Sequence, residues 1–256
     1  MSQLAKERRS FVSQGAMSTI GHPERERQDR IIALFCEGLG YRYLGDWSAR
    51  PGNSNIEEGL LTEHLLRSGY SAGQASRAIY LLKAEAENRV RSAYDNNKAV
   101  YSLRRYGVGE KLEASHVTET VQLIERNHPE KNDFAVAEEV TLAGPQERRP
   151  DLVLYRNGIA VGVIELKNSH ITVGNGIRQL LSNQQKEFNG WFFTTVQVVL
   201  AGNDSEGLRY GTVGTPEKMF LQWKEDEADN SRLKLPPKWR SHRHMLNSLP
   251  APIQMA

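Results

Sequence analysis

Two apolar segments joined by an Asn-Gly pair constrain the fold of this chain more than any other feature. Residues 151–155 (DLVLY) and 159–166 (IAVGVIEL) flank an Arg-Asn-Gly turn at 156–158. Asn-Gly readily adopts the positive-φ conformations that a two-residue hairpin turn requires. The second segment is apolar on both faces until Glu165. The sequence therefore predicts a buried β-hairpin.

The hairpin brings three ionisable side chains into one small volume. Side chains alternate between the two faces of a strand, so Glu165 and Lys167 point the same way and Leu166 points the other way. With a two-residue loop, Asp151 comes to lie opposite residues 164–166. Two neighbouring carboxylates repel each other, and the repulsion is relieved when one takes up a proton or when a divalent cation binds.

These residue types suit the hydrolysis of a phosphodiester. Mg²⁺ prefers oxygen ligands and keeps several waters, so Asp151 and Glu165 are the candidate metal ligands, with the backbone carbonyl of Leu166 as a further candidate. Lys167 would orient or deprotonate a metal-bound water, or stabilise charge on the phosphate. A structural alternative stays open because Glu-x-Lys is a weak motif: Asp151 would cap a turn, and Glu165 with Lys167 would form a surface pair. A carboxylate that ends a buried strand is costly unless it is paired, which favours the functional interpretation.

Other polar residues are weaker candidates for the same site. Gln179 follows on the next expected helix, where an amide can hold a water or a phosphate oxygen, although a solvated glutamine is the commoner case. Arg149 and Arg178 are candidates for contacts with DNA phosphates. Spacing does not decide which further carboxylate completes a metal site, and the candidates are Glu24, Glu26, Asp29, Glu138 and Glu139.

Composition excludes several classes of protein. The net charge of +2 over 256 residues does not by itself indicate nucleic-acid binding, and the single cysteine, Cys36, rules out an internal disulfide and a Cys-rich zinc site. The sequence contains no apolar run of membrane-spanning length and no phosphate-binding GxxxxGK[ST] loop. No hydrophobic region follows MSQLAKERRS, so we expect no secretory signal. We therefore expect a cytoplasmic protein without a membrane partner.

The rest of the chain predicts an α/β protein in which a helical block precedes a β-rich part. We expect helices over residues 23–36, 56–67 and 71–93, with Asn96, Asn97 and Gly107 breaking the pattern, and a later helix over 176–188. The remaining expected strands lie at 41–44, 117–124, 135–143, 192–204, 208–212 and 218–223.

The segments RRPDLVLYRNGIAVGVIELKNS and GIRQLLSNQ resemble the nuclease region of the restriction (R) subunit of type I restriction–modification enzymes, in the PD-(D/E)xK nuclease superfamily. Further similar segments are NKAVYSLRRYGV, NDFAVAEEVTL, TTVQVVLAGNDSEGLRYGT and MFLQWKED, so the resemblance covers about residues 23–226. It assigns Asp151, Glu165 and Lys167 to the motif and Gln179 to the first position of a Gln-x-x-x-Tyr motif. Asn183 stands where that motif has tyrosine.

The resemblance implies a restriction-endonuclease-like fold, with a central mixed sheet flanked by helices. The residue pattern predicts a mobile lead-in (1–22), a mainly helical block packing on the core (23–110) and a flexible tail (227–256). The resemblance makes residues 111–226 a nuclease core and places a missing motor domain beyond the tail. It also implies Mg²⁺ as cofactor, ATP only for that motor, and as partners double-stranded DNA with the methylation (M) and specificity (S) subunits. The chain is expected to be a fragment or a naturally short relative.

Two alternatives to this function stay open from the sequence. One is a docking module, in which the helical block binds the M or S subunit. The other is a stand-alone repair or junction nuclease that works without ATP or partners. The sequence does not give the DNA recognition sequence, the number of metal ions or the oligomeric state.

Overall fold

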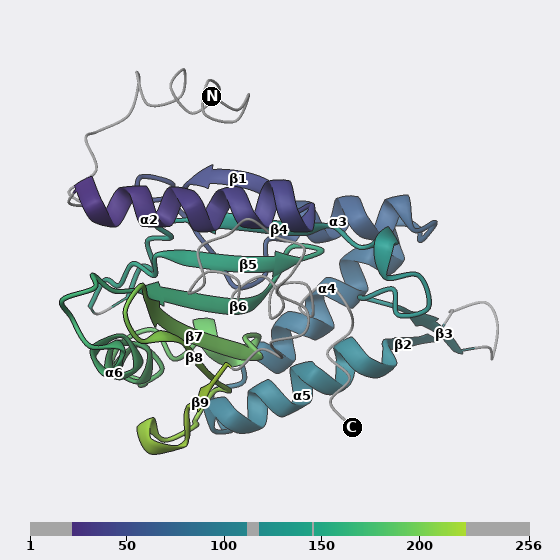
Figure 1. The fold of residues 1–256 in the computed structure, drawn as a ribbon. Helices are drawn as coiled ribbons and strands as arrows, with labels where there is room; N and C mark the ends of the chain where they lie inside the picture. Colours follow the sequence, from purple (N-terminus) through teal and green to yellow (C-terminus); the bar gives the residue numbers. More distant parts are fainter. Residues whose placement is uncertain (1–21, 112–117, 145, 224–256) are drawn as a thin grey trace.

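A computed structural model of the chain describes residues 22–111, 118–144 and 146–223, and shows a mixed sheet with helices on both faces (Figure 1). The helices are α2 (His22–Ala33), α3 (Glu58–Arg67), α4 (Ala72–Ala86), α5 (Ala93–Tyr106) and α6 (Val173–Asn183), with a π-helical turn at Leu34–Gly38 and 3₁₀ turns at Pro129–Lys131, Phe192–Thr194 and Glu217–Met219. The strands are β1 (Arg42–Asp46), β2 (Val108–Lys111), β3 (Thr118–Val121), β4 (Phe134–Glu138), β5 (Leu152–Arg156), β6 (Ile159–Leu166), β7 (Val198–Asn203), β8 (Gly207–Gly211) and β9 (Leu221–Gln222). The α/β class with a central mixed sheet is confirmed.

The predicted hairpin lies at the centre of a seven-stranded sheet of order β1-β4-β5-β6-β7-β8-β9. The pairs β1–β4 and β6–β7 are parallel, and the other neighbours are antiparallel. Asn157 and Gly158 have φ angles of 54° and 82°, and Arg156 pairs with Ile159, as the Asn-Gly turn predicts. Because β6 and β7 are parallel neighbours, the chain needs a crossover between them, and α6 lies in it.

Side chains of the hairpin pack in two separate hydrophobic cores, one on each face of the sheet. The core between the sheet and α2 contains Ile31, Ile32, Phe35, Leu152, Leu154, Ile164 and Leu166. The core between the sheet and α6 contains Val153, Tyr155, Val163, Val173, Ile177, Leu180 and Ala201. Even-numbered positions of β5 therefore face α2 and odd-numbered positions face α6, which fixes the face on which the polar ends of these strands lie.

Helices α3, α4 and α5 surround a third core with the β2–β3 hairpin, formed by Leu61, Leu65, Leu82, Val100 and Val121 among others. Hydrogen bonds join this block to the sheet. The Glu57 amide donates to the Gly158 carbonyl at 2.8 Å, and the Asn97 side chain donates to the carbonyls of Phe193 at 3.0 Å and Val196 at 2.6 Å. The domain boundaries expected from the sequence stay a prediction, and the lead-in and tail lie outside the described residues, apart from His22 in α2.

The single long helix expected over residues 71–93 is wrong, because α4 ends at Ala86 and α5 follows as a separate helix. Asn96 and Asn97, expected to break a helix, lie inside α5. The Asn96 side chain donates to the carbonyls of Ala86 at 3.3 Å and Asn88 at 2.7 Å. It thereby satisfies backbone acceptors that the end of α4 leaves without partners, a role invisible in the local sequence pattern.

Other element boundaries also differ from expectation. The strand expected over 218–223 is reduced to β9, because residues 217–219 form a 3₁₀ turn, and the helix expected to reach 188 ends at Asn183. The strand expected over 192–204 begins only at Val198, because residues 192–194 form a 3₁₀ turn whose neighbouring carbonyls bind α5 side chains. The strand expected over 135–143 ends at Glu138, where the positive φ of Glu139 (52°) turns the chain. Helix α6 begins at Val173 rather than 176, since the Glu206 carboxylate accepts from the Val173 amide at 3.0 Å. Among the described helices, none has the length and hydropathy needed to cross a bilayer.

Candidate active site

The hairpin register brings Asp151 to the end of β6. Leu152 pairs with Ile164, and one residue earlier the Asp151 carboxylate (Oδ2) accepts a hydrogen bond from the Leu166 amide at 2.5 Å. Val153 of β5 and Val163 of β6 face α6, whereas Leu152, Ile164 and Leu166 face α2. Asp151, Glu165 and Lys167 alternate with these α2-facing residues and therefore share the α6 face. The juxtaposition expected from strand alternation and a two-residue turn is therefore present.

Glu165 is fully buried at the end of β6, with 0% exposure. Its Oε2 lies 3.5 Å from Nζ of Lys167, while its Oε1 has no hydrogen-bond partner among the described residues. Burial, and then the charge of Asp151, hold the pKa of Glu165 well above its usual range, against the opposing effect of Lys167. A solvent-exposed Glu165–Lys167 pair, the structural alternative, does not fit a carboxylate in this position.

Lys167 follows the last residue of β6 and connects the strand to α6. Its Nζ donates to Oε1 of Gln179 at 2.6 Å, and only 15% of its side chain is exposed. The backbone of α6 approaches its stem closely: a Cβ atom placed on Gly176 would lie 3.2 Å from Cγ of Lys167 and 3.1 Å from Cβ of Ala201. Gly176 therefore allows the lysine to lie between helix and sheet, a role that the sequence alone did not indicate.

Glu139 lies beside this group without joining it directly. Its carboxylate accepts from the Gln28 side chain at 3.0 Å and pairs with the Arg149 guanidinium at 2.8 Å. Burial raises the pKa of Glu139 to about 7, with the Gln28 hydrogen bond and Arg149 opposing and the negative charge of Asp151 adding to the shift. Arg149, a candidate for phosphate contact, thus already has an anionic partner next to the site.

The other candidate carboxylates are held elsewhere, or their side chains are not described. Glu138 is fully buried and accepts from Gln28, Arg25 and the Tyr43 hydroxyl. Asp29 pairs with Arg25 at 3.5 Å, Glu26 is exposed, and the Glu24 side chain lies outside the described residues. Over the described ranges, no three His, Cys, Asp or Glu side chains form a group that could hold a metal ion. A metal site here would rest on two carboxylates.

Asp151 and Glu165 fit a magnesium ion by two criteria. Mg²⁺ needs only one or two carboxylates when water and substrate phosphate complete its octahedron. The buried Oε1 of Glu165, unpaired in the described part of the chain, is an acceptor whose isolation costs about 1–3 kcal/mol. A cation beside Asp151 and Glu165 would satisfy that atom and offset the burial and the repulsion by Asp151 that raise the Glu165 pKa.

Two sequence candidates lie further along α6. Arg178 is half-exposed and binds the Glu217 carboxylate at 2.6 Å, as well as the Asn175 side chain. Asn183, at the position of the motif tyrosine, is 1% exposed, and neither atom of its amide has a partner among the described residues. The DNA-contact role of Arg178 stays a prediction.

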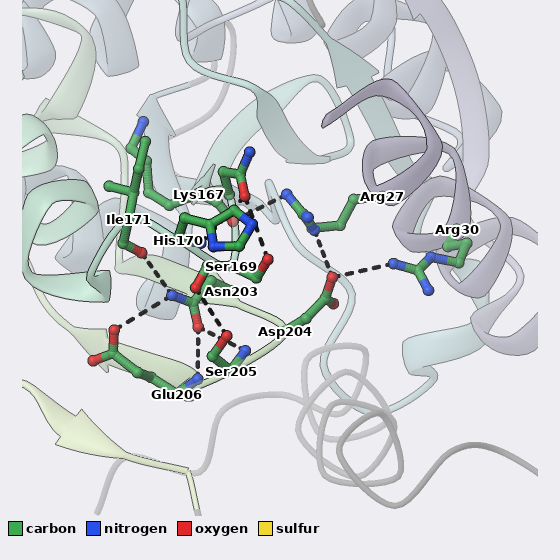
Figure 2. A network of polar contacts seen from close by, with 11 residues as sticks. Arg27, Arg30, Lys167, Ser169, His170, Ile171, Asn203, Asp204, Ser205 and Glu206 are labelled. Carbon is green, nitrogen blue, oxygen red and sulfur yellow. Dashed lines mark hydrogen bonds and ion pairs between the residues drawn. The ribbon is translucent and has the colours of Figure 1, made fainter. Parts of the chain in front are cut away.

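Two residues of α2 that sequence reasoning missed reach the site from the opposite face of the sheet. The buried Arg27 donates to the Lys167 carbonyl at 3.1 Å and to the Asp204 carboxylate at 2.8 Å (Figure 2). The buried Gln28 donates to the Asp151 carbonyl at 3.2 Å. A signal for both was present in the sequence, because they lie one helical turn before the core residues Ile31 and Ile32.

The segment that joins Lys167 to α6 is held by the β7–β8 turn (Figure 2). The Asn203 side chain donates to the Ile171 carbonyl at 2.8 Å, and the Ser205 hydroxyl donates to the Ser169 carbonyl at 2.9 Å. The same turn supplies Asp204 to Arg27. Residues 167–171 have no regular secondary structure. Their backbone is nevertheless fixed by side chains from α2, from the end of β7 and from the β7–β8 turn.

Comparison with known proteins gives two findings. Residues 22–218 match the family described as Type I restriction enzyme R protein N terminus. The putative type I restriction enzyme MjaVIIIP endonuclease subunit of Methanocaldococcus jannaschii is 27% identical over 213 residues. That match covers 80% of this chain and 19% of the relative, so the chain spans about a fifth of the relative's length.

Proposed function

The chain belongs to the family of type I restriction enzyme R protein N termini, and from this premise we propose that it is a Mg²⁺-dependent endonuclease domain acting on duplex DNA. In this proposal Asp151 and Glu165 hold the metal ion, and Lys167 and Gln179 complete the group that acts on the phosphodiester. The relative's name as an endonuclease subunit supports nuclease activity for the family.

The observation that carries the proposal is the burial of Glu165 next to Asp151 at the end of the central hairpin. A carboxylate with 0% exposure and one oxygen unpaired within the described residues is a poor structural element, because its ionised form is costly in that place. A bound cation would stabilise the ionised carboxylate and remove this cost. Asp151 is already oriented toward the same strand end by the Leu166 amide.

The side chains of the chain divide the work. Mg²⁺, when bound, supplies a Lewis acid that polarises the phosphate and lowers the pKa of a bound water. Lys167 supplies a positive charge in a mostly buried position, where it stabilises the negative charge that builds up on the phosphate oxygens. Gln179 fixes the lysine ammonium by accepting its hydrogen bond, so that the charge is oriented before the DNA arrives.

We extend the proposal to the whole enzyme. An ATP-driven motor outside this chain would deliver unmethylated DNA to the site by translocation, and the M and S subunits would select it, in the cytoplasm. Arg149 and Arg178 would contact the phosphates. The isolated chain would then cleave slowly or not at all, because delivery and selection depend on those partners.

The test is DNA cleavage by the assembled enzyme carrying Asp151→Asn, Glu165→Gln or Lys167→Ala. Each variant should lose at least about a hundredfold in cleavage rate, while ATP hydrolysis continues. Lys83→Ala is the matched control and should leave both activities unchanged. Lys83 lies on the surface of α4, where it pairs with Glu58 of α3. Cleavage at the normal rate by all three site variants would rule out the proposed function.

A second candidate function is docking of a partner subunit by the helical block, and one observation favours it. Tyr80, Tyr94 and Tyr106 of α4 and α5 are each more than 60% exposed, at 62%, 64% and 68%. Aromatic side chains are enriched at protein interfaces. Replacement of the three tyrosines by serine should reduce co-purification with the M and S subunits, and unchanged co-purification would exclude these three side chains as the contact.

A further inference from the structure

Helix α2 covers the face of the sheet opposite α6. Two adjacent side chains of this helix nevertheless bind backbone atoms of the candidate catalytic residues. Arg27 has only 6% of its side chain exposed, and Gln28 is 2% exposed as a residue. Burying an arginine and an amide among apolar residues is costly unless every donor is used. The hydrogen-bond partners of Arg27 and Gln28 therefore indicate the role of each residue.

Arg27 fixes the backbone of Lys167. Lys167 lies one residue beyond β6, where the ladder to β7 ends, and its amide still donates to the Gly202 carbonyl at 2.8 Å. Its own carbonyl accepts from the Arg27 guanidinium at 3.1 Å. The same guanidinium donates to Asp204 at 2.8 Å, so that one planar group joins the lysine to the β7–β8 turn (Figure 2).

Gln28 acts on the other strand of the hairpin. Its side-chain nitrogen lies 3.2 Å from the Asp151 carbonyl, which also accepts from the Glu139 amide at 2.9 Å. The same nitrogen lies 3.1 Å and 3.0 Å from the carboxylates of Glu138 and Glu139. The two N–H groups of the Gln28 amide are thus shared among three acceptors, the Asp151 carbonyl and the two buried carboxyl groups, so Gln28 contacts the main chain at Asp151.

We propose that Arg27 and Gln28 are positioning residues, by which α2 fixes the two strand ends that carry Lys167 and Asp151. The inference rests on the proposed nuclease function and adds to it two residues that do not touch the reacting atoms. Two neighbouring residues of one rigid helix hold the two halves of the catalytic group at a constant separation. A displacement of about 1 Å in such a group costs about a hundredfold in rate.

The test separates positioning from folding. Arg27→Met and Gln28→Met keep the volume of each side chain and remove its hydrogen bonds, and Arg27→Lys keeps the charge with a single donor site. Arg30→Met is the matched control, because Arg30 is 54% exposed on the same helix and reaches the same Asp204 oxygen at 3.4 Å. All variants are measured in the assembled enzyme at a temperature at which circular dichroism shows the chain fully folded.

We expect Arg27→Met to lower kcat of cleavage about tenfold to a hundredfold without changing KM for DNA, Arg27→Lys to recover part of that loss, and Arg30→Met to behave as the parent. Gln28→Met should also weaken the binding of Mn²⁺ to the isolated chain, measured by electron paramagnetic resonance, by about tenfold or more. A purely structural role would lower the melting temperature and leave both kcat in the folded protein and the Mn²⁺ affinity unchanged.

Two outcomes are distinguishable. If Asp151→Asn is inactive while Arg27→Met and Gln28→Met keep full kcat and Mn²⁺ affinity, the positioning role is wrong and the nuclease site stands. If Asp151→Asn itself cleaves normally, the proposed function fails first. Should Arg27→Met not fold, Arg27→Lys decides: a kcat equal to that of the parent overturns the inference.

Discussion

The ammonium nitrogen of Lys167 lies 2.6 Å from the side-chain oxygen of Gln179, across the junction between the central sheet and α6. We predict that Gln179→Leu, which removes the acceptor and keeps the bulk, lowers the cleavage rate about tenfold or more because the ammonium is no longer oriented. Gln185→Leu, at an exposed position just after α6, is the control and should leave the rate unchanged. Equal rates for the two variants would show that Gln179 does not act on Lys167.

Gly176 allows the same lysine to approach α6. A methyl group there would lie 3.2 Å from Cγ of Lys167 and 3.1 Å from Cβ of Ala201, which is tighter than ordinary contact. Gly176→Ala gains helix propensity, by about 1 kcal/mol, and so we expect little change in the free energy of unfolding but a clear loss of cleavage. Gly174→Ala is the control for the gain in helix propensity, because its methyl group would meet only side-chain atoms of Arg178, Glu217 and Thr172. A normal cleavage rate in Gly176→Ala would contradict the close approach.

Gly158 combines a positive φ of 82° with a crowded position. A Cβ atom there would lie 2.8 Å from the carbonyl oxygen of Glu57 and from the amide nitrogen of Leu61, both at the start of α3. Gly158→Ala should lower the free energy of unfolding by about 3 kcal/mol or more, measured by denaturant titration. Gly52→Ala has a comparable φ of 72° with nothing within 4 Å, and should cost only about 1 kcal/mol. Equal costs would mean that the contact with α3 is not tight.

His64 makes the stability of the helical block sensitive to acid. It is 2% exposed, and burial lowers its pKa from 6.5 to about 4. The unfolded chain therefore takes up a proton below about pH 6.5 while the folded chain does not, so this group's contribution is present above that pH and is lost as the pH falls through about 4. Between about pH 7 and pH 5 this effect lowers the free energy of unfolding of the parent by about 2 kcal/mol, and His64→Leu should abolish that part of the pH dependence. The exposed His170, replaced in the same way, should leave the pH dependence unchanged, and a His64→Leu curve parallel to that of the parent would refute the prediction.

The parts of the site that the sequence predicts are those set by local rules. The Asn157-Gly158 turn fixes the register of β5 on β6, and strand alternation then puts Glu165 and Lys167 on one face. Asp151 comes opposite β6 for the same reason. None of this needs knowledge of distant segments, and the structure has each of these features.

The parts that the sequence does not predict depend on distant packing. Nothing local to Arg27 or Gln28 indicates that they bind strand ends more than 100 residues away, although their place on the apolar face of α2 was visible. Asn96 lies within α5, and its side chain donates to carbonyls at and just after the end of α4. The low helix propensity of asparagine therefore predicted the helix end in the wrong place. Gly176 matters only because α6 crosses Lys167 closely. In each case tertiary contacts override the local pattern.

A crystal structure of the chain soaked with Mn²⁺, with the ion located by its anomalous scattering, would show whether Asp151 and Glu165 hold a metal ion together. We predict one ion with a carboxylate oxygen of Asp151 and one of Glu165 both at about 2.0–2.3 Å, next to the Lys167 ammonium. A chain that binds Mn²⁺ elsewhere, or that leaves both carboxylates without the ion at saturating concentration, would contradict this prediction.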